Sequence, residues 1–363
     1  VRYLKLFNTK KELKVIQYFQ DCFLNDLASY ETLRKSFIHN DINDHNIIIT
    51  KKLVNPDVKG IIDFGDTLKS QTINDLAVTC TYAIMNCTNP LSSAISVVRG
   101  YNENYKLFDN ELYHLYNLIG MRLVVSLTKS AINKTEFKEN KYLLISEDSA
   151  WDLIYKWHSI DRKFAHYNFR QACDLTPHPN QVKFDTWAIN QQINIIDLFP
   201  SINKNEFLKL DLSVSSEWLG LSDNFKDLDL FENKIKYLQQ QNLDKIISGG
   251  YLEPRQLYNT ENYKRECNNG IESRTIHLGV DFWVGEGTEI TNLFDGIVDT
   301  ISIDKNEKGY GGLIIIKHKI NDFSFYTLFG HLSPNKFNYN VGDFLKKGAL
   351  IGIVGNKIEN GNW

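Results

Sequence analysis

Three acidic or amide side chains lie next to apolar runs in the first part of the chain. Asp41 and Asn46 stand within residues 37–49, where a polar cluster separates two apolar, strand-like runs, and Asp63 ends the apolar run that begins at Gly60. Phosphoryl transfer needs an Asp that accepts or orients the proton of the attacking hydroxyl, and hard oxygen ligands for magnesium. Asp41, Asn46 and Asp63 supply that set, since one amide and one carboxylate suffice for the metal.

A simpler interpretation of Asp41 and Asn46 is a hairpin or capping cluster, because Asn and Asp commonly hydrogen-bond to nearby backbone in turns. For these two residues alone the two interpretations are balanced. The acid at Asp63 and the later segment Asn74-Asp75-Leu76-Ala77 favour a site for phosphoryl transfer.

A second candidate site lies near the other end of the chain. His277 and Asp281 are four residues apart, and zinc binds imidazole nitrogen and carboxylate oxygen. A fully extended strand would hold their Cα atoms about 13 Å apart, so the backbone must bend, and Gly279 is where it can. His331 follows an apolar strand-like run and a glycine. A catalytic zinc site has three protein ligands and an open position for water.

The alternative for His277 and Asp281 is an ordinary hydrogen-bonding pair in a β-domain, which is the more common role of an unsupported His and Asp. The additional His331 favours a zinc site. His318 lies in an apolar strand-like run, and we expect it to face a neighbouring strand and not a metal.

The elements that must position these residues differ between the two parts of the chain. Apolar spacing of three and four predicts helices over residues 10–33, 76–85, 95–105, 110–131 and 149–169. Short apolar runs punctuated by glycine predict strands over residues 296–298, 313–317, 323–328 and 350–354.

The domain organisation follows from these patterns. We predict a mainly helical domain over residues 1–180 and an antiparallel β-domain over residues 246–363, so the fold class is α+β with several domains. Residues 181–245 form a linker region, with a short strand at 211–215 and a polar helix at 223–241.

Composition and charge exclude some classes of binding partner. The chain has 363 residues and a formal net charge of −3 without a dominant basic cluster, so we expect no binding of nucleic acid or of an anionic membrane. Its longest apolar runs are far below the roughly 20 residues of a membrane-spanning helix. Five scattered cysteines without a CxxC pair indicate reduced thiols, and we expect a cytoplasmic protein.

The first set of motifs resembles a known family. His39-x-Asp41-x-x-x-x-Asn46, followed by Ile62-Asp63-Phe64-Gly65-Asp66 and Asn74-Asp75-Leu76-Ala77, is similar to the aminoglycoside phosphotransferase and hydroxylysine kinase-like family. The resemblance implies a protein-kinase-like C-terminal lobe that uses ATP and Mg²⁺. It also implies that Asp41 is the catalytic base, that Asn46 and Asp63 bind the nucleotide's magnesium, and that Asp75 ties the following helix to the catalytic loop.

Two departures from this family matter. Asn40 stands where the family usually has Gly, and Asn is the next most tolerant residue for a left-handed backbone, so we expect an intact loop. The Gly-rich loop, strand Lys and helix Glu of the family would belong to an N-terminal lobe before residue 1. We therefore expect this chain alone to bind ATP weakly.

The second set resembles the lysostaphin-like zinc endopeptidases, whose signature pairs His-x-x-x-Asp with a later His-x-His. The segments that carry the likeness are 277–281, 295–298, 309–312, 330–333, 341–343 and 348–352. The resemblance implies that His277 and Asp281 are zinc ligands and that His331 is the catalytic histidine. The third ligand is expected just after Trp363, so we expect this chain alone to bind zinc weakly.

The order of the two parts resembles a fusion in which a pyridoxal phosphate-dependent aminotransferase domain follows in the same full-length chain. We expect a bifunctional protein, with a kinase acting on a small hydroxylated amine and a zinc peptidase hydrolysing a peptide or amide bond, and we expect this chain alone to be inactive. The alternative for the β-domain is a docking or spacer module without catalytic activity.

Overall fold

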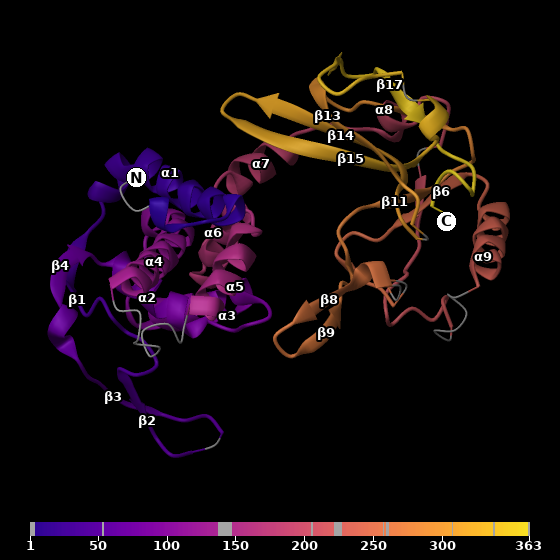
Figure 1. Cartoon of the computed structure of the whole chain (residues 1–363). Helices are drawn as coiled ribbons and strands as arrows, with labels where there is room; N and C mark the ends of the chain where they lie inside the picture. Colours follow the sequence, from indigo (N-terminus) through magenta and orange to yellow (C-terminus); the bar gives the residue numbers. More distant parts are fainter. Residues whose placement is uncertain are drawn as a thin grey trace. The chain divides into compact units, whose positions relative to one another are not determined.

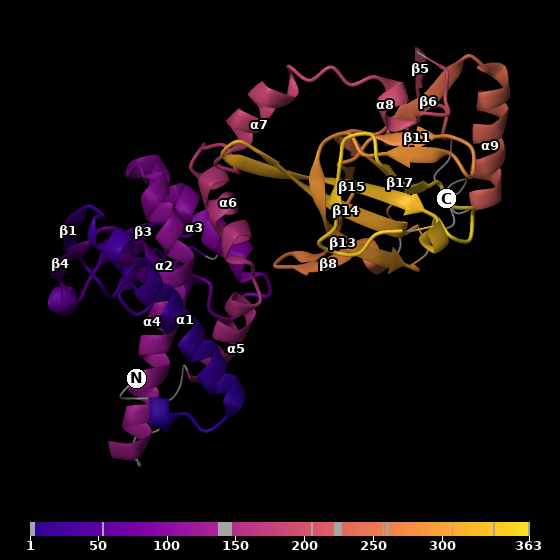
Figure 2. The same cartoon turned by 90° about the horizontal axis from the view of Figure 1, so that it is seen from above.

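The computed structural model describes residues 4–52, 54–136, 147–204, 206–220, 227–256, 258, 261–306, 308–336 and 338–361. The chain divides into two compact units. Unit 1 comprises Val1–Gln181 with Glu266–Gly270, and unit 2 comprises Val182–Arg265 with Ile271–Trp363. Figures 1 and 2 show that helices dominate unit 1, whereas strands dominate unit 2.

The described residues of unit 1 form six α-helices up to residue 172. They are α1 (Lys10–Glu31), α2 (Ile73–Ala83), α3 (Pro90–Asn104), α4 (Asp109–Glu136), α5 (Glu147–His158) and α6 (Arg162–Ala172). The helix predicted over residues 149–169 is wrong, because the chain forms α5 and α6 with a break between them. Asp161 causes the new start, since its side chain accepts a hydrogen bond of 2.8 Å from the backbone N–H of Phe164 and caps α6.

Helix α4 is the centre of this unit and contacts α1, α2, α5 and α6. The core around it contains large, fully buried side chains, among them Phe19, Tyr116 and Trp157. Tyr116 and Trp157 stack with centroids 5.4 Å apart, and each donates a side-chain hydrogen bond to the other's backbone carbonyl. Because both polar ends are satisfied, these two aromatic residues fix α4 against α5 without leaving a buried donor unpaired.

Two small antiparallel sheets accompany the helices of unit 1. Strand β1 (Lys35–Ile38) pairs with β4 (Leu68–Gln71), and between them in the chain β2 (Ile47–Ile49) pairs with β3 (Val58–Ile61) in a hairpin. Figure 1 shows the β2–β3 hairpin reaching away from the helices. The segment between β1 and β2 carries Asp41, so these two sheets are the elements that position the first candidate site.

Unit 2 contains a four-stranded antiparallel sheet with the order β15-β14-β13-β16. Its strands are β13 (Gly296–Asp304), β14 (Gly311–Ile320), β15 (Phe323–Leu332) and β16 (Phe344–Leu345). A further pair joins β12 (Glu289–Thr291) to β17 (Leu350–Ile353). The four predicted strands are confirmed as β13, β14, β15 and β17. Their inward-facing residues Val298, Ile314, Ile316 and Ile351 form a buried core.

Further helices and strands belong wholly or partly to unit 2. They are α7 (Gln181–Ala188), which begins in unit 1, α8 (Ile195–Leu198), α9 (Leu228–Gln241), β5 (Glu206–Lys209), β6 (Lys245–Gly249), β7 (Glu253–Pro254), β10 (Ile276–His277) and β11 (Asp281–Trp283), together with β8 (Lys264–Cys267) and β9 (Gly270–Ser273), which each lie partly in unit 1. Strands β5 and β6 are parallel, whereas β6 and β11 are antiparallel. This small mixed sheet is an exception to the predicted antiparallel arrangement.

The strand predicted at residues 211–215 is wrong, because the strand of this region is β5. The side chain of Asp211 accepts a hydrogen bond of 2.8 Å from the backbone N–H of Ser213, which turns the chain instead of extending it. The predicted polar helix is present as α9, and residues 223–226 of that prediction lie outside the described residues. Among the described residues, no helix combines the length and hydropathy needed to cross a membrane.

Candidate active sites

The β2–β3 hairpin brings the two predicted magnesium ligands to the same end of the hairpin. Ile47 pairs with Ile61, and the backbone N–H of Ile62 donates a hydrogen bond of 3.0 Å to the carbonyl of Asn46. Asn46 stands directly before β2 and Asp63 follows Ile62. The hairpin register therefore places Asn46 and Asp63 on two adjacent chain segments, although they are seventeen positions apart in sequence.

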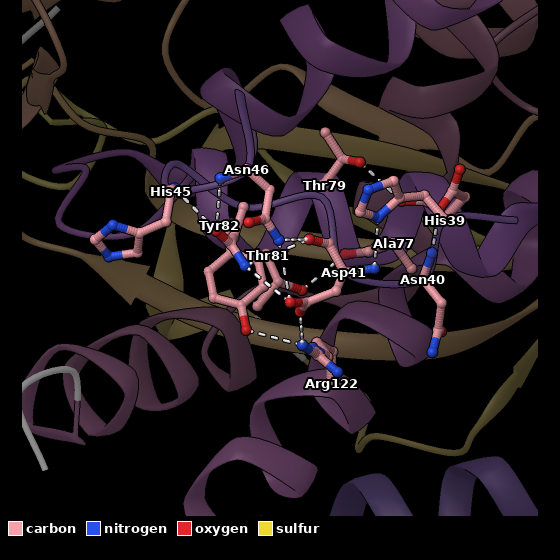
Figure 3. A network of polar contacts seen from close by, with 12 residues as sticks. His39, Asn40, Asp41, His45, Asn46, Ala77, Thr79, Thr81, Tyr82 and Arg122 are labelled. Atoms are coloured by element: carbon pink, nitrogen blue, oxygen red, sulfur yellow. Dashed lines mark hydrogen bonds and ion pairs between the residues drawn. The ribbon is translucent and has the colours of Figure 1, made fainter. Parts of the chain in front are cut away.

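The carboxylate of Asp41 is held on both of its oxygens (Figure 3). Its Oδ2 accepts hydrogen bonds from the side-chain amides of Asn43 at 3.1 Å and Asn46 at 3.3 Å. Its Oδ1 accepts from Nη2 of Arg122 at 2.8 Å, in an ion pair that links the loop to α4. Because Asn46 donates its amide nitrogen to Asp41, its amide oxygen is the atom that can bind a cation.

The loop backbone is fixed in two left-handed positions. Asn40 has φ 65°, and its N–H donates a hydrogen bond of 2.8 Å to Oδ1 of Asp75 in α2. Asp63 has φ 63°, and its exposed carboxylate accepts from the N–H of Gly65 at 3.4 Å. Asn40 thus adopts the conformation that the sequence led us to expect at this position, and the contact with Asp75 joins α2 to the loop.

His39 connects the segment after β1 to the segment after β3. It is buried, and its Nε2–H donates a hydrogen bond of 2.9 Å to the carbonyl of Ile62. Its ring packs against Phe64 with centroids 4.8 Å apart. His39 therefore holds the segment that carries Asp63 against the segment that carries Asp41, whereas His45 in the same loop is exposed.

In unit 2, His277 and Asp281 are brought together by a bend at Gly279, which separates β10 from β11. Nε2 of His277 lies 3.5 Å from Oδ1 of Asp281. Two ligand atoms about 2.0–2.1 Å from one tetrahedral zinc ion would lie roughly 3.3 Å apart, so the pair has the spacing of two ligands. A Cβ on Gly279 would lie only 3.2 Å from Nε2 of His277, so glycine keeps that nitrogen accessible.

The other atoms of this pair are engaged by the protein. Nδ1–H of His277 donates to the carbonyl of Gly250 at 2.8 Å, which leaves Nε2 with its lone pair for a metal. Oδ2 of Asp281 accepts from Nη2 of Arg255 at 2.6 Å, and Nε of Arg255 donates to Glu253 at 2.7 Å. Each candidate ligand thus has one orienting bond and one atom left for coordination.

Arg255 is the buried charge of this cluster, with only 4% of its side chain exposed. Burial acts to lower the pKa of its guanidinium, but the negative charge of Asp281 and the hydrogen bond that the guanidinium donates to Glu253 outweigh burial and raise that pKa above its ordinary value. Arg255 therefore stays charged and holds both carboxylates. Tyr258, whose hydroxyl lies 3.5 Å from Nη1 of Arg255, packs beside this cluster, and burial raises its pKa.

His331 is positioned separately at the end of β15. It has φ 61°, and its Nδ1–H donates a hydrogen bond of 2.6 Å to the carbonyl of Asn360. No group of three or more His, Cys, Asp or Glu side chains within the described residues is arranged to hold a metal. The structure thus joins His277 with Asp281, while the expected third ligand lies outside the described residues.

His318 is fully buried, as expected for a strand residue that faces its neighbour. One ring nitrogen lies 3.0 Å from the carbonyl of Asp295, and the other lies 2.7 Å from the hydroxyl of Thr327 on β15. Burial lowers its pKa and favours the neutral ring. Its contacts are those of a structural residue.

Sequence reasoning missed the charged and amide partners of both acids. These are Asn43 and Arg122 around Asp41, and Glu253 and Arg255 around Asp281. Asn43 carried a signal, because an Asn two residues after an Asp in a turn commonly bonds back to the local chain. The arginines carried none, since each belongs to a different element from the acid that it contacts.

Two family models match parts of this chain. The model of the phosphotransferase enzyme family matches residues 2–106, and the model of peptidase family M23 matches residues 275–362. The first range contains Asp41, Asn46 and Asp63, and the second contains His277, Asp281 and His331. Both descriptions name families of enzymes.

Three curated relatives are hydroxylysine kinases. That of Xenopus laevis is 29% identical over 145 residues, covering 38% of this chain and 38% of the relative. That of Bos taurus is 28% identical over 164 residues, covering 43% of each chain, and that of Danio rerio is 32% identical over 120 residues, covering 31% of this chain and 32% of the relative.

The chain spans about two fifths or less of the length of these relatives. No solved structure matches the chain significantly. The two family matches nevertheless fall on the two units whose sites are described above, one on each. The chain is thus similar to the phosphotransferase enzyme family over residues 2–106 and to peptidase family M23 over residues 275–362.

Proposed function

We propose that unit 1 transfers a phosphoryl group from ATP to the hydroxyl of a small hydroxylated amine. The observation that carries this proposal is the carboxylate of Asp41, which is held by two amides and an arginine next to the hairpin end that bears Asn46 and Asp63. The match to the phosphotransferase enzyme family supports it. The relatives named hydroxylysine kinases support a hydroxylated amine as the acceptor.

Each residue has a role that fits its chemistry. Asp41 accepts the proton of the acceptor hydroxyl, because its carboxylate is oriented and has lone pairs beyond those used by its partners. Asn46 and Asp63 would hold Mg²⁺ through an amide and a carboxylate oxygen. Bound magnesium neutralises the charge that develops on the phosphates.

The surface of the β2–β3 hairpin supports binding of a flat, partly apolar ligand such as the base of ATP. Several large apolar side chains are exposed on and beside this hairpin, namely Ile48, Ile49, Val58, Ile61 and Phe64. Contiguous exposed apolar residues of this kind commonly mark a surface that another group covers. The five cysteines are scattered along the sequence without a CxxC pair, which agrees with the reducing cytoplasm in which we propose that the kinase acts.

The test is release of ADP by the full-length protein with Mg²⁺, ATP and either hydroxylysine or ethanolamine. Lysine is the control acceptor, because it lacks the hydroxyl. Asp41→Asn should lower kcat by about 10²–10⁴-fold, since it removes the base. The matched variant Asp44→Asn removes an exposed charge from the same loop and should leave kcat unchanged. Equal ADP release with lysine, or full turnover by Asp41→Asn, would contradict the proposal.

We also propose that unit 2 is a zinc-dependent peptidase that hydrolyses a peptide or amide bond. The specific observation is the 3.5 Å separation between Nε2 of His277 and Oδ1 of Asp281, with the remaining atom of each side chain oriented by the protein. The match to peptidase family M23 supports it. Zinc held there would polarise the scissile carbonyl and activate water, while His331 would bind or relay a proton.

A docking or spacer module is the alternative for unit 2, and it would need no metal. In this alternative, we propose that unit 2 joins the kinase to an aminotransferase domain elsewhere in the full-length protein. Zinc content of the full-length protein separates the two interpretations of unit 2.

A further inference from the structure

Arg122 is a feature of the first site that lies outside the residues matched by the phosphotransferase family model. It belongs to α4, 81 positions after Asp41, and its Nη2 contacts Oδ1 of that carboxylate at 2.8 Å. The same nitrogen donates to the hydroxyl of Tyr82 in α2 at 2.8 Å. The guanidinium also lies near the Tyr82 ring, with 5.4 Å between Cζ and the ring centroid. Figure 3 shows Arg122 between the hydroxyl of Tyr82 and the carboxylate of Asp41.

The loop that carries Asp41 has no positively charged Lys or Arg side chain of its own. Between His39 and Asn46 the sequence contains neither Lys nor Arg. The amides of Asn43 and Asn46 donate to the backbone carbonyl of Asp41 and, of its two carboxylate oxygens, only to Oδ2. Without a further donor, the Oδ1 side of the carboxylate would be free to rotate and would face the negative phosphates unscreened. Arg122 supplies a fixed positive charge and a directional hydrogen bond on that side, and it does so with 18% of its side chain exposed.

We propose that Arg122 is a positioning residue for phosphoryl transfer, which holds Asp41 in the orientation that accepts the substrate proton. This inference rests on the proposed kinase function. In the reaction the acceptor oxygen bonds to the γ-phosphorus of ATP, the bond from that phosphorus to the bridging oxygen breaks, and ADP leaves with the electron pair. The hydroxyl proton moves to Asp41. Arg122 exchanges no atoms and acts through the orientation and charge balance of Asp41.

A purely structural role for Arg122 would be to tie α4 to α2 through Tyr82. Arg162 provides the matched control for that role. Its Nη2 contacts Asp26 at 2.5 Å, its guanidinium lies 4.4 Å from the centroid of the Tyr113 ring, and its Nε, like that of Arg122, is buried without a hydrogen-bond partner among the described residues. Arg162 therefore shares the bonding pattern of Arg122 but pairs with a carboxylate outside the candidate site.

The experiment measures kcat and KM of the full-length protein with ATP and hydroxylysine for Arg122→Ala, Arg122→Lys and Arg162→Ala, together with their melting temperatures. Arg122→Ala should lower kcat about 10²-fold with little change in KM for ATP, because a misplaced base affects the transition state more than ground-state binding. Millimolar guanidinium chloride should restore several-fold activity to Arg122→Ala, and Arg122→Lys should keep more activity than the alanine variant. Arg162→Ala should melt at a lower temperature and keep its kcat.

An Arg122→Ala kcat within about twofold of wild type would overturn the inference while leaving the kinase assignment intact. An equal loss of kcat in Arg122→Ala and Arg162→Ala, without rescue by guanidinium, would also overturn it in favour of the structural role. Absence of ADP release by the wild-type protein itself would overturn the proposed function and this inference together.

Discussion

Asp281 and Asp41 are oriented in the same way. In each case an arginine from another segment donates a hydrogen bond to one carboxylate oxygen. For Asp281 the arginine is Arg255, which is nearly fully buried and shared with the buried carboxylate of Glu253. Removing one partner of a buried, hydrogen-bonded ion cluster leaves uncompensated charge in a medium of low dielectric constant, which costs far more than the loss of an exposed pair.

Arg255→Met should therefore lower the free energy of unfolding of unit 2 by about 3–5 kcal/mol, measured by urea denaturation. The control is Arg265→Met, whose partner Glu272 lies 3.3 Å away and whose side chain is largely exposed. Arg265→Met should lower the free energy of unfolding by at most about 1 kcal/mol. Equal changes in the two variants would show that the Arg255 cluster contributes no more than a surface pair.

At the residue scale the sequence led to predictions for the acids and histidines but not for their partners. Asp41, Asn46 and Asp63 were proposed because their types and spacing suit magnesium and proton transfer, and their roles stay predictions. Arg122 and Arg255 could not, because their proximity to Asp41 and Asp281 depends on how α4 and β7 pack and not on local spacing. His277 and Asp281 were predicted to need a bend at Gly279, and the chain bends there.

Packing of α1 against α4 depends on a single glycine. A Cβ added to Gly120 in α4 would lie 2.2 Å from the ring of Phe19 in α1, and Phe19 is fully buried. The two helices therefore approach closely at this point, and a side chain there would force the ring or a helix to move.

Gly120→Ala should destabilise unit 1 by about 1–3 kcal/mol through overpacking. Gly100→Ala, in the interior of α3 with open space around its Cα, should stabilise it by about 0.5–1 kcal/mol, because alanine favours the helix. Thermal and urea unfolding of both variants would measure the difference. A Gly120→Ala protein as stable as wild type would contradict the close packing of α1 and α4.

Elements with long, strong periodicity were predicted well, including α1, α4 and the strands β13 to β15. The errors lie where one side chain redirects the backbone. Asp161 begins a new helix within the predicted 149–169 segment, and Asp211 turns the chain just after β5. The parallel pairing of β5 with β6 joins segments distant in sequence, and local patterns carry no information about such pairing.

For the whole chain, most of the 21 glycines follow residue 248. Their distribution now corresponds to two units of different construction. The glycine-poor helices of unit 1 bear a carboxylate and amide site, and the glycine-rich strands of unit 2 bear a His–Asp pair. The two sites use different residues and are proposed to use different metals. We therefore expect that a substitution in one site abolishes the activity of that site and leaves the other site unchanged.

The most direct test of this account is a crossed measurement on the full-length protein. ADP release with hydroxylysine and bound zinc are measured for wild type, Asp41→Asn and His277→Ala. We predict that Asp41→Asn loses ADP release and keeps its zinc, whereas His277→Ala loses zinc and keeps ADP release. Unchanged zinc in His277→Ala together with unchanged ADP release in Asp41→Asn would contradict the assignment of two separate chemical sites to this chain.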